Sequence, residues 1–382
     1  MKIVADENIP FALEAFGTLG DVELISGRDA TPETFRDCDV FFTRSVTKVN
    51  EQMFGESPVR FVGTATIGTD HVDRDFLAQR GIAFASAPGS NANSVAEYVT
   101  ASLLVMADRN GTRLEGKSIG VVGVGSVGSR VVAKAEALGM EVLQNDPPLA
   151  RETGDARFVP LDDLMGVDFL TFHTPLTREG QDATWHLCDE ARMRQLQLSA
   201  VILNTSRGPV VANEPLKEHL AEGWLGGGVL DVWETEPLID LDLLDKVAIA
   251  TPHIAGYSFD GKVSGTEMVY RAACEALGLE PTWDPASVMP EPEVPGIEID
   301  CTDMDDEDII RAAVLTVYDI LADDHDFREM PDDADEHREF FDQLRKTYPQ
   351  RREFHNTLLV LHGASDGLKA KLTGIGFQVQ DA

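Results

Sequence analysis

Three polar residues of this chain, Arg207, Glu236 and His253, have side chains that could act together in catalysis, and each follows an apolar run. The runs occupy residues 200–207, 228–233 and 247–253. They are typical of buried strands in a parallel sheet, whose carboxyl ends meet at the edge where α/β proteins bind ligands. An imidazole can accept a hydroxyl proton, a carboxylate can orient and stabilise that imidazole, and a guanidinium can hold a substrate carboxylate with two hydrogen bonds. The set predicts oxidation of a 2-hydroxy acid.

Each member of the set also has an ordinary explanation when it is taken alone. Arg207 can be a surface ion-pair donor, Glu236 a loop acid before Pro237, and His253 a turn histidine whose ring is satisfied locally. Their joint occurrence after successive predicted strands favours the catalytic interpretation.

A glycine fingerprint lies upstream of this set, at Gly123, Gly125 and Gly128. Such glycines allow a tight turn, close approach of the backbone to a pyrophosphate, and close packing of helix on strand. Asp146 follows 18 residues after Gly128, at the end of the next predicted strand. There it can accept hydrogen bonds from ribose hydroxyls and repel a 2′-phosphate, which favours NAD over NADP.

Two further residues near the fingerprint leave alternatives open. Asp146 can also be a plain turn aspartate before two prolines, and the two roles are compatible. Thr174 and the backbone around it can contact the cofactor, while the neighbouring His173 is equally well explained as an ordinary strand-end histidine.

Short apolar runs alternate with helical patterns, which predicts α/β domains with parallel sheets. We expect two doubly wound (Rossmann or flavodoxin-like) domains: a substrate-binding domain over 1–93 with 257–280, and an NAD-binding domain over 94–256. Strands are expected at 2–5, 21–25, 39–43 and 60–63, and then at 118–123, 140–145, 168–173, 200–204, 227–232 and 247–250. Ser94 and Glu97 have the spacing of a capping box before a helix that extends to about residue 108.

The pattern of residues 281–382 predicts a small C-terminal α+β domain, and we expect this domain to mediate assembly of the protein. A segment rich in proline and acid, 281–296, has the composition of a linker. A helix is expected over 308–321 and strands at 358–361 and 376–380.

Composition excludes several classes of protein. The net charge is −34, which argues against nucleic acid as a partner. No apolar run is long enough to span a membrane, and the charged N-terminus is unlike a signal peptide, so we expect a cytoplasmic protein. The four cysteines are scattered, which predicts reduced thiols and no metal site. The acidic surface is also a feature of proteins from salt-tolerant hosts.

Several motifs resemble those of the D-isomer-specific 2-hydroxyacid dehydrogenases and cover roughly residues 86–256. They are the glycine fingerprint and the segments 173–177, 204–208, 228–237 and 251–256. Within that superfamily the chain resembles the erythronate-4-phosphate dehydrogenases of vitamin B6 (pyridoxine) biosynthesis, through the segments 6–10, 43–47, 63–73, 253–258 and 348–354.

This resemblance implies roles for individual residues and a homodimer formed through the C-terminal domain. The catalytic residues would be Arg207, Glu236 and His253. NAD would contact Asp146, Thr174, Thr205, Ser206, Arg207, Asp231 and Gly256. The substrate, 4-phospho-D-erythronate, would contact Ser45, Thr66 and Tyr257, and Arg44 is a further candidate for its phosphate. The product would be (R)-3-hydroxy-2-oxo-4-phosphooxybutanoate.

Two other functions remain open at this point. One is D-3-phosphoglycerate dehydrogenase, whose substrate is one carbon shorter. The other is an NAD(H)-sensing, corepressor-like binding protein of the same fold. A pair of cations in the acidic tail, Arg351 and Arg352, can either reach into a partner subunit's site or serve solubility.

Overall fold

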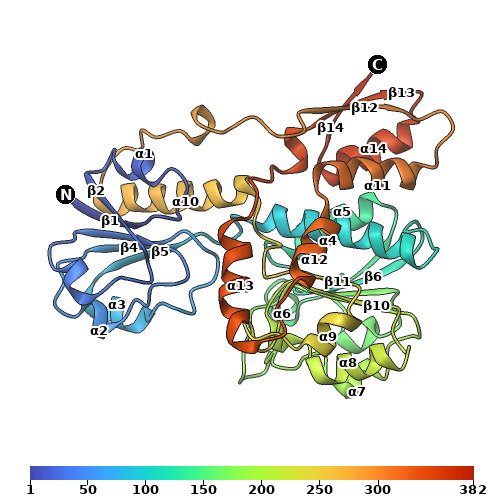
Figure 1. The fold of residues 1–382 in the computed structure, drawn as a ribbon, viewed down its shortest axis with the longest axis horizontal. Coiled ribbons are helices and arrows are strands. Elements are labelled where there is room, and N and C mark those ends of the chain that lie inside the picture. The colour runs from blue at the N-terminus through green and yellow to red at the C-terminus, as the bar shows by residue number, and fades with distance from the viewer. The chain divides into compact units, whose positions relative to one another are not determined.

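The structure is a computed structural model that describes residues 1–382, and the chain forms two compact units. The first unit comprises Met1–Asn91 with Ser258–Glu291, and the second comprises Ala92–Tyr257 with Pro292–Ala382. Each unit is built on its own parallel sheet (Figure 1). No helix is long and apolar enough to cross a membrane.

The sheet of the first unit has the strand order β2-β1-β3-β4-β5, and all its pairs are parallel. The strands are β1 (Lys2–Asp6), β2 (Asp21–Ile25), β3 (Val40–Thr43), β4 (Phe61–Thr64) and β5 (Ala83–Ser86). The helices are α1 (Ala12–Phe16), α2 (Glu51–Phe54), α3 (Arg74–Arg80) and α10 (Phe259–Leu277), with 3-10 turns at Pro32–Phe35 and Pro285–Ser287. The four predicted strands are confirmed, and β5 is an addition to them.

Apolar side chains alternate between the two faces of this sheet, and each face carries a core. Ile3 and Phe42 pack with residues of α1 and α10 on one face. Val4 and Phe41 pack with Phe54 of α2 and other apolar residues on the opposite face. Helix α10 comes late in the sequence, yet it packs on β4, β5 and α1 of the first unit (Figure 1).

The main sheet of the second unit has the order β11-β10-β9-β8-β6-β7 and is also parallel throughout. Its strands are β6 (Ser118–Val122), β7 (Glu141–Asn145), β8 (Phe169–Phe172), β9 (Val201–Asn204), β10 (Gly227–Leu230) and β11 (Ile249–Ala250). The helices around it are α4 (Ala92–Arg109), α5 (Gly128–Ala137), α6 (Pro147–Thr153), α7 (Glu190–Met193), α8 (Asn213–Ala221) and α9 (Leu241–Lys246), with 3-10 turns at Leu161–Leu164 and Gly208–Val210. All six predicted strands are confirmed. The order reverses between β6 and β8, so the ligand crevice of such a sheet lies at their carboxyl ends.

The C-terminal segment adds a small parallel sheet of order β12-β13-β14 to the second unit. Its elements are β12 (Gly296–Asp300), α11 (Asp306–Val317), α12 (Ile320–Arg328), α13 (Ala334–Lys346), a 3-10 turn (Phe354–Asn356), β13 (Leu358–His362), α14 (Asp366–Ile375) and β14 (Gln378–Asp381). The single helix predicted over 308–321 is in fact two, α11 and α12, which are separated at Tyr318 and Asp319.

Direct contacts join this segment to the main sheet. The backbone N–H of Ala250 in β11 donates a hydrogen bond to Asp324 of α12 over 2.8 Å. The ring of Trp233 packs at 5.7 Å from that of Phe327. Helix α14 packs against α5, and α11 against α4 (Figure 1). The segment after residue 292 therefore shares a core with the main sheet.

The predicted capping box at Ser94 and Glu97 is wrong. Helix α4 begins at Ala92, two residues before Ser94, and both side chains make long-range contacts instead. The Ser94 hydroxyl donates to the carbonyl of Ala255, and Glu97, which is 0% exposed, pairs with Arg351 at 3.0 Å. A local spacing pattern cannot distinguish a cap from residues that meet distant partners.

The same ion pair contradicts both predicted uses of Arg351, a reach into a partner subunit's site and surface solubility. Arg351 is 8% exposed, and its guanidinium contacts Glu97, Ser94 and the face of the Tyr318 ring. Arg352 is also buried, and it donates to Asn356. Arg351 is thus occupied within its own chain and stabilises the attachment of the tail to α4.

Candidate active site

The glycine fingerprint forms the loop between β6 and α5, at the crevice of the second unit's main sheet. Gly123 has φ +85°, and a Cβ there would lie 2.8 Å from the carbonyl oxygen of His173. A Cβ on Gly128 would lie 1.9 Å from the carbonyl oxygen of Gly123, so this position must be glycine for the helix to pack. A Cβ on Gly125 would meet nothing within 4 Å. The space beside Gly125 is therefore open to a ligand, as close approach of a pyrophosphate requires.

Asp146 lies at the end of β7 and links that strand to the glycine loop. One carboxylate oxygen accepts from the N–H of Leu149 at 3.0 Å and so caps α6, and the other accepts from Val124 at 2.8 Å. The turn role and the predicted ribose role remain compatible, because an ionised carboxylate has about four acceptor positions.

His173 and Thr174 follow β8 on the other side of the crevice. Burial lowers the pKa of His173 to about 3, so the ring is neutral near pH 7. Its two nitrogens lie within hydrogen-bonding distance of the hydroxyls of Thr171 and Thr205. The Thr174 hydroxyl is buried and has no partner in the protein. Since buried polar groups are normally hydrogen-bonded, an unpaired hydroxyl here fits a bound dinucleotide.

The turn that carries Thr205, Ser206 and Arg207 follows β9 and is held by Asn204. The buried Asn204 amide accepts from the N–H and hydroxyl of Ser206 and donates to the carbonyl of Arg207. The next residue, Gly208, packs so tightly that a Cβ would lie 2.0 Å from the Trp233 backbone. This contact brings the Arg207 turn against the loop that leads to Glu236.

Glu236 and His253 form a direct pair. The Nδ1 atom of His253 lies 2.6 Å from Oε1 of Glu236, and Oε2 accepts from the N–H of Trp233 at 3.1 Å. Burial opposes ionisation of Glu236, but the attraction of His253 and these hydrogen bonds outweigh it and lower the pKa of the carboxyl. The ring of His253 is thereby held with Nδ1 toward the acid.

The backbone that carries His253 is held by Asp231, which is 1% exposed. Its carboxylate accepts from the Thr251 hydroxyl and from the N–H groups of Ile254 and Ala255, at 2.7 to 3.1 Å. His253 itself has φ +59°, a left-handed conformation that is costly for a non-glycine residue and is concentrated at functional sites. Asp231 therefore fixes the loop around this residue, and its implied contact with NAD stays a prediction.

The candidate substrate residues lie in both units and are described within each. In the first unit, Arg44 and Ser45 follow β3, and Thr66 follows the neighbouring β4. The Thr66 hydroxyl lies 2.8 Å from that of Thr64, and the Thr64 hydroxyl donates to the carbonyl of Arg44. These three residues therefore share one edge of the first sheet.

In the second unit, Gly256 and Tyr257 continue the loop beyond His253. The Tyr257 ring lies 5.8 Å from that of Tyr348, and the guanidinium of Arg345 lies 5.5 Å from its centroid. Sequence reasoning identified neither Tyr348 nor Arg345 as a neighbour of the site, because both come from the C-terminal segment. It also missed the positioning roles of Asn204 and Asp231. The only indication of these roles in the sequence is that each is a polar residue at the end of an apolar strand.

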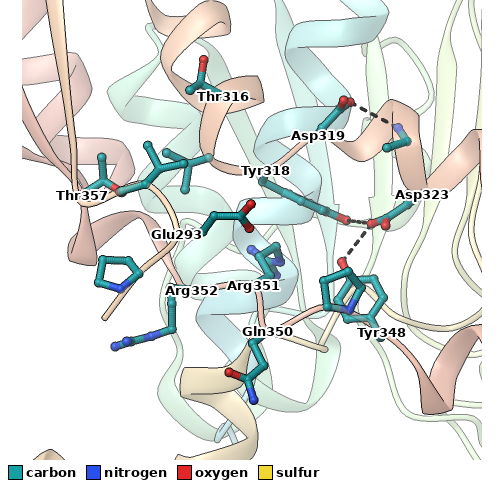
Figure 2. A pocket seen from close by; sticks show the side chains of 15 residues that line it. Glu293, Thr316, Tyr318, Asp319, Asp323, Tyr348, Gln350, Arg351, Arg352 and Thr357 are labelled. Carbon is teal, nitrogen blue, oxygen red and sulfur yellow. Dashed lines mark hydrogen bonds between the residues drawn. The ribbon is translucent and has the colours of Figure 1, made fainter. Parts of the chain in front are cut away.

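The C-terminal segment contains a cavity of about 290 Å³, shown in Figure 2. The hydroxyls of Tyr318 and Tyr348 both donate to Asp323 there, at 3.0 and 2.9 Å. Burial raises the pKa of Asp323 to about 6, although both hydroxyls stabilise its charge. Neither Arg207, Glu236 nor His253 lines this cavity, so it is separate from the catalytic set.

Comparison with known families agrees with these features. Residues 90–255 match the family "D-isomer specific 2-hydroxyacid dehydrogenase, NAD binding domain", so NAD is the cofactor of this domain. Residues 288–376 match a family described as "Domain of unknown function (DUF3410)". The crystal structure of D-lactate dehydrogenase from Aquifex aeolicus, complexed with NAD and lactic acid, is similar with a TM-score of 0.59 and 25% identity, covering 72% of this chain and 96% of that chain.

Two relatives are more similar in sequence and match nearly full length. An erythronate-4-phosphate dehydrogenase of Pseudomonas putida is 44% identical, covering 98% of this chain and 99% of the relative. One of Escherichia fergusonii is 44% identical, covering 96% and 95% respectively. The chain therefore belongs to the erythronate-4-phosphate dehydrogenase family of NAD-dependent D-2-hydroxyacid dehydrogenases.

Proposed function

We propose that this protein oxidises 4-phospho-D-erythronate to (R)-3-hydroxy-2-oxo-4-phosphooxybutanoate with NAD, in vitamin B6 biosynthesis. The observation that carries the chemistry is the 2.6 Å contact between His253 and Glu236 beside a dinucleotide-binding crevice. The substrate is inferred from the names of the full-length relatives.

His253 is the proposed general base. Because its Nδ1 faces Glu236, Nε2 is the ring nitrogen that takes the proton from the C2 hydroxyl. The carboxylate of Glu236 stabilises the imidazolium that results. The Gly125 loop and Thr174 would hold NAD, which would supply the hydride acceptor for this reaction.

Arg207 is the proposed partner of the substrate carboxylate. Its guanidinium can bind both oxygens of the substrate carboxylate. It can also polarise the oxygen on C2 as the hydroxyl is converted to a carbonyl. The Asn204 contacts and the tight packing at Gly208 hold this turn in place, so the position of the cation is set by the main sheet.

The other end of the substrate carries a phosphate. We assign it to Ser45, Thr66 and Arg44 of the first unit, and Tyr257 is a further proposed contact of the substrate. Residues 1–93 with 257–280 then act as a substrate-binding domain and 94–256 as the NAD-binding domain. Hydroxyl and guanidinium donors suit phosphate oxygens.

The segment 281–382 is the proposed dimerisation domain of a homodimer. Light scattering of the full chain, compared with a chain in which exposed apolar residues such as Met304 are replaced by Lys, tests this. A monomer in the wild-type protein at assay concentration contradicts the dimer. The expected cytoplasmic location stays a prediction.

The test of the function is NADH formation with NAD and one of three acids: 4-phospho-D-erythronate, 3-phospho-D-glycerate or D-lactate. A parallel run includes a 2-oxo acid to remove NADH that stays bound. We expect a clear preference for phosphoerythronate. A preference for phosphoglycerate would keep the mechanism and overturn the substrate, and no turnover of any acid would overturn both.

A further inference from the structure

Arg345 is a cation of the C-terminal segment that packs on the ring of Tyr257 and pairs with no carboxylate. It belongs to the last turn of α13, and its Nε is buried and makes no hydrogen bond within the protein. The neighbouring arginines differ: Arg328 pairs with Asp324, and Arg351 pairs with Glu97. In a chain with 66 acidic and 32 basic residues, a half-buried arginine without a carboxylate needs an explanation.

Two aromatic rings fix where this cation lies. The guanidinium carbon is 5.5 Å from the centroid of the Tyr257 ring and 5.5 Å from that of Phe341. Both contacts are within the range of cation–π attraction. Tyr257 follows His253 by four residues and is one of the proposed substrate residues. Arg345 is therefore held at the edge of the proposed site by apolar surfaces, which leave its hydrogen-bond donors uncommitted.

Arg345 also lies close enough to the catalytic acid to influence it. Burial raises the pKa of Glu236, whereas His253, the N–H of Trp233 and, as the smallest of these causes, the charge of Arg345 lower it. No ion pair joins the two side chains, and the partners of the Glu236 oxygens are His253 and the N–H of Trp233. Arg345 therefore acts on the acid through its charge, without an ion pair to it.

We propose that Arg345 is a specificity-determining residue that binds the phosphate group of the substrate. This inference rests on the proposed function, since it assigns one end of the same substrate. Arg207 already serves the carboxylate at C1, next to the atoms that react. The guanidinium beside Tyr257 is offset from them and presents planar donors that match phosphate oxygens. The domain of unknown function would then supply a substrate contact to its own chain.

The experiment compares Arg345→Met with Arg338→Met in the full-length protein. Arg338 is an exposed arginine of the same helix and serves as the matched control. For Arg345→Met we expect the KM for 4-phospho-D-erythronate to rise about tenfold to a hundredfold, as expected for losing hydrogen bonds between charged groups. The kcat, the KM for NAD and the melting temperature should change little, and Arg338→Met should behave as wild type.

Unphosphorylated D-erythronate distinguishes a phosphate contact from a structural one. The kcat/KM for this acid should be the same in Arg345→Met and wild type. An equal loss with both acids, or no loss with either, would overturn the proposal. Arg345→Lys should restore part of the affinity, because lysine keeps the charge without the planar fork. If the Met variant does not fold, Arg345→Lys replaces it, with a smaller rise in KM confined to the phosphorylated acid.

Calorimetric titration with inorganic phosphate, in the presence of NAD, makes this test independent of turnover. Weaker phosphate binding in the Arg345 variant than in wild type supports the proposal, and equal binding overturns it. If wild type fails to oxidise phosphoerythronate, the proposed function fails, while the titration still decides the role of Arg345.

Discussion

His253 Nδ1 lies 2.6 Å from Glu236 Oε1, and the second oxygen of that carboxylate accepts the N–H of Trp233. This arrangement holds both the acid and the ring in one orientation. His253 reaches it from a backbone with φ +59° that is tied by its N–H to the carbonyl of Asp231. The pair is thus oriented by two backbone groups of the loop that follows β10.

Replacing His253 with Ala should remove most of the turnover and leave cofactor binding intact. Positioned proton transfer contributes about 10²–10⁴-fold to rate, so kcat should fall by that factor. NADH formation at saturating substrate measures it, and a fluorescence titration with NADH provides the control. Near-normal turnover would show that another group takes the proton.

Replacing Glu236 with Gln should change the pH dependence of the reaction. Burial opposes ionisation of Glu236, but His253 and hydrogen bonds lower the pKa of its carboxyl, so wild type keeps an anion beside the ring. Without the anionic partner the imidazolium is less stable, and the acid limb of kcat/KM should move to lower pH. Superimposable profiles would count against the pairing.

The glycine loop offers a contrast between two substitutions. Gly125→Ala should leave the melting temperature almost unchanged, since its Cβ enters open space, but should weaken NAD binding by about tenfold or more by blocking the pyrophosphate. Gly128→Ala should destabilise the fold by about 1–3 kcal/mol, because its Cβ would overlap the carbonyl of Gly123. Thermal melts and NADH titrations of both variants test this, and tight NAD binding by Gly125→Ala would contradict the assignment.

The sequence predicted the parts of the site that depend on local patterns. The glycine spacing and the strand-end positions of Arg207, Glu236 and His253 follow from the alternation of strand and helix, and the main strands were confirmed. Strand β5 was missed because its run of four residues, Ala-Phe-Ala-Ser, is short and no more than half-buried, so its hydrophobic signal is weak.

What the sequence could not predict depends on contacts between distant segments. The ion pair of Glu97 with Arg351 joins residues 254 positions apart, and nothing in either local segment indicates it. The approach of Arg345 to Tyr257 likewise depends on how α13 packs on the second unit. Local patterns identify which side chains can do chemistry, and tertiary packing decides which of them meet.

The cavity residue Asp323 should make stability depend on pH. Burial raises its pKa to about 6 from an ordinary value of 3.8, so the folded state holds a proton that the unfolded state has released. The contribution of protonated Asp323 to the free energy of unfolding is full below the unfolded pKa, and it is lost as the pH rises through about 6. Between pH 5 and 7.5, wild type should therefore lose about 1 kcal/mol relative to Asp323→Asn. Urea unfolding at both pH values measures this, and a constant difference would contradict it.

Asp231→Asn should impair catalysis through the loop that carries His253. The carboxylate accepts from the Thr251 hydroxyl and from the N–H groups of Ile254 and Ala255. In asparagine, one of the two oxygens is replaced by an NH₂ group, which cannot accept, so at least one of these three donors loses its partner. Leaving such a buried group unsatisfied costs about 1–3 kcal/mol of stability. Because the loop also sets the orientation of the His253 ring, kcat should fall even at temperatures where the variant is fully folded. The exposed Asp245→Asn is the matched control, and an Asp231→Asn enzyme with lower stability but normal kcat would show that the carboxylate serves folding alone.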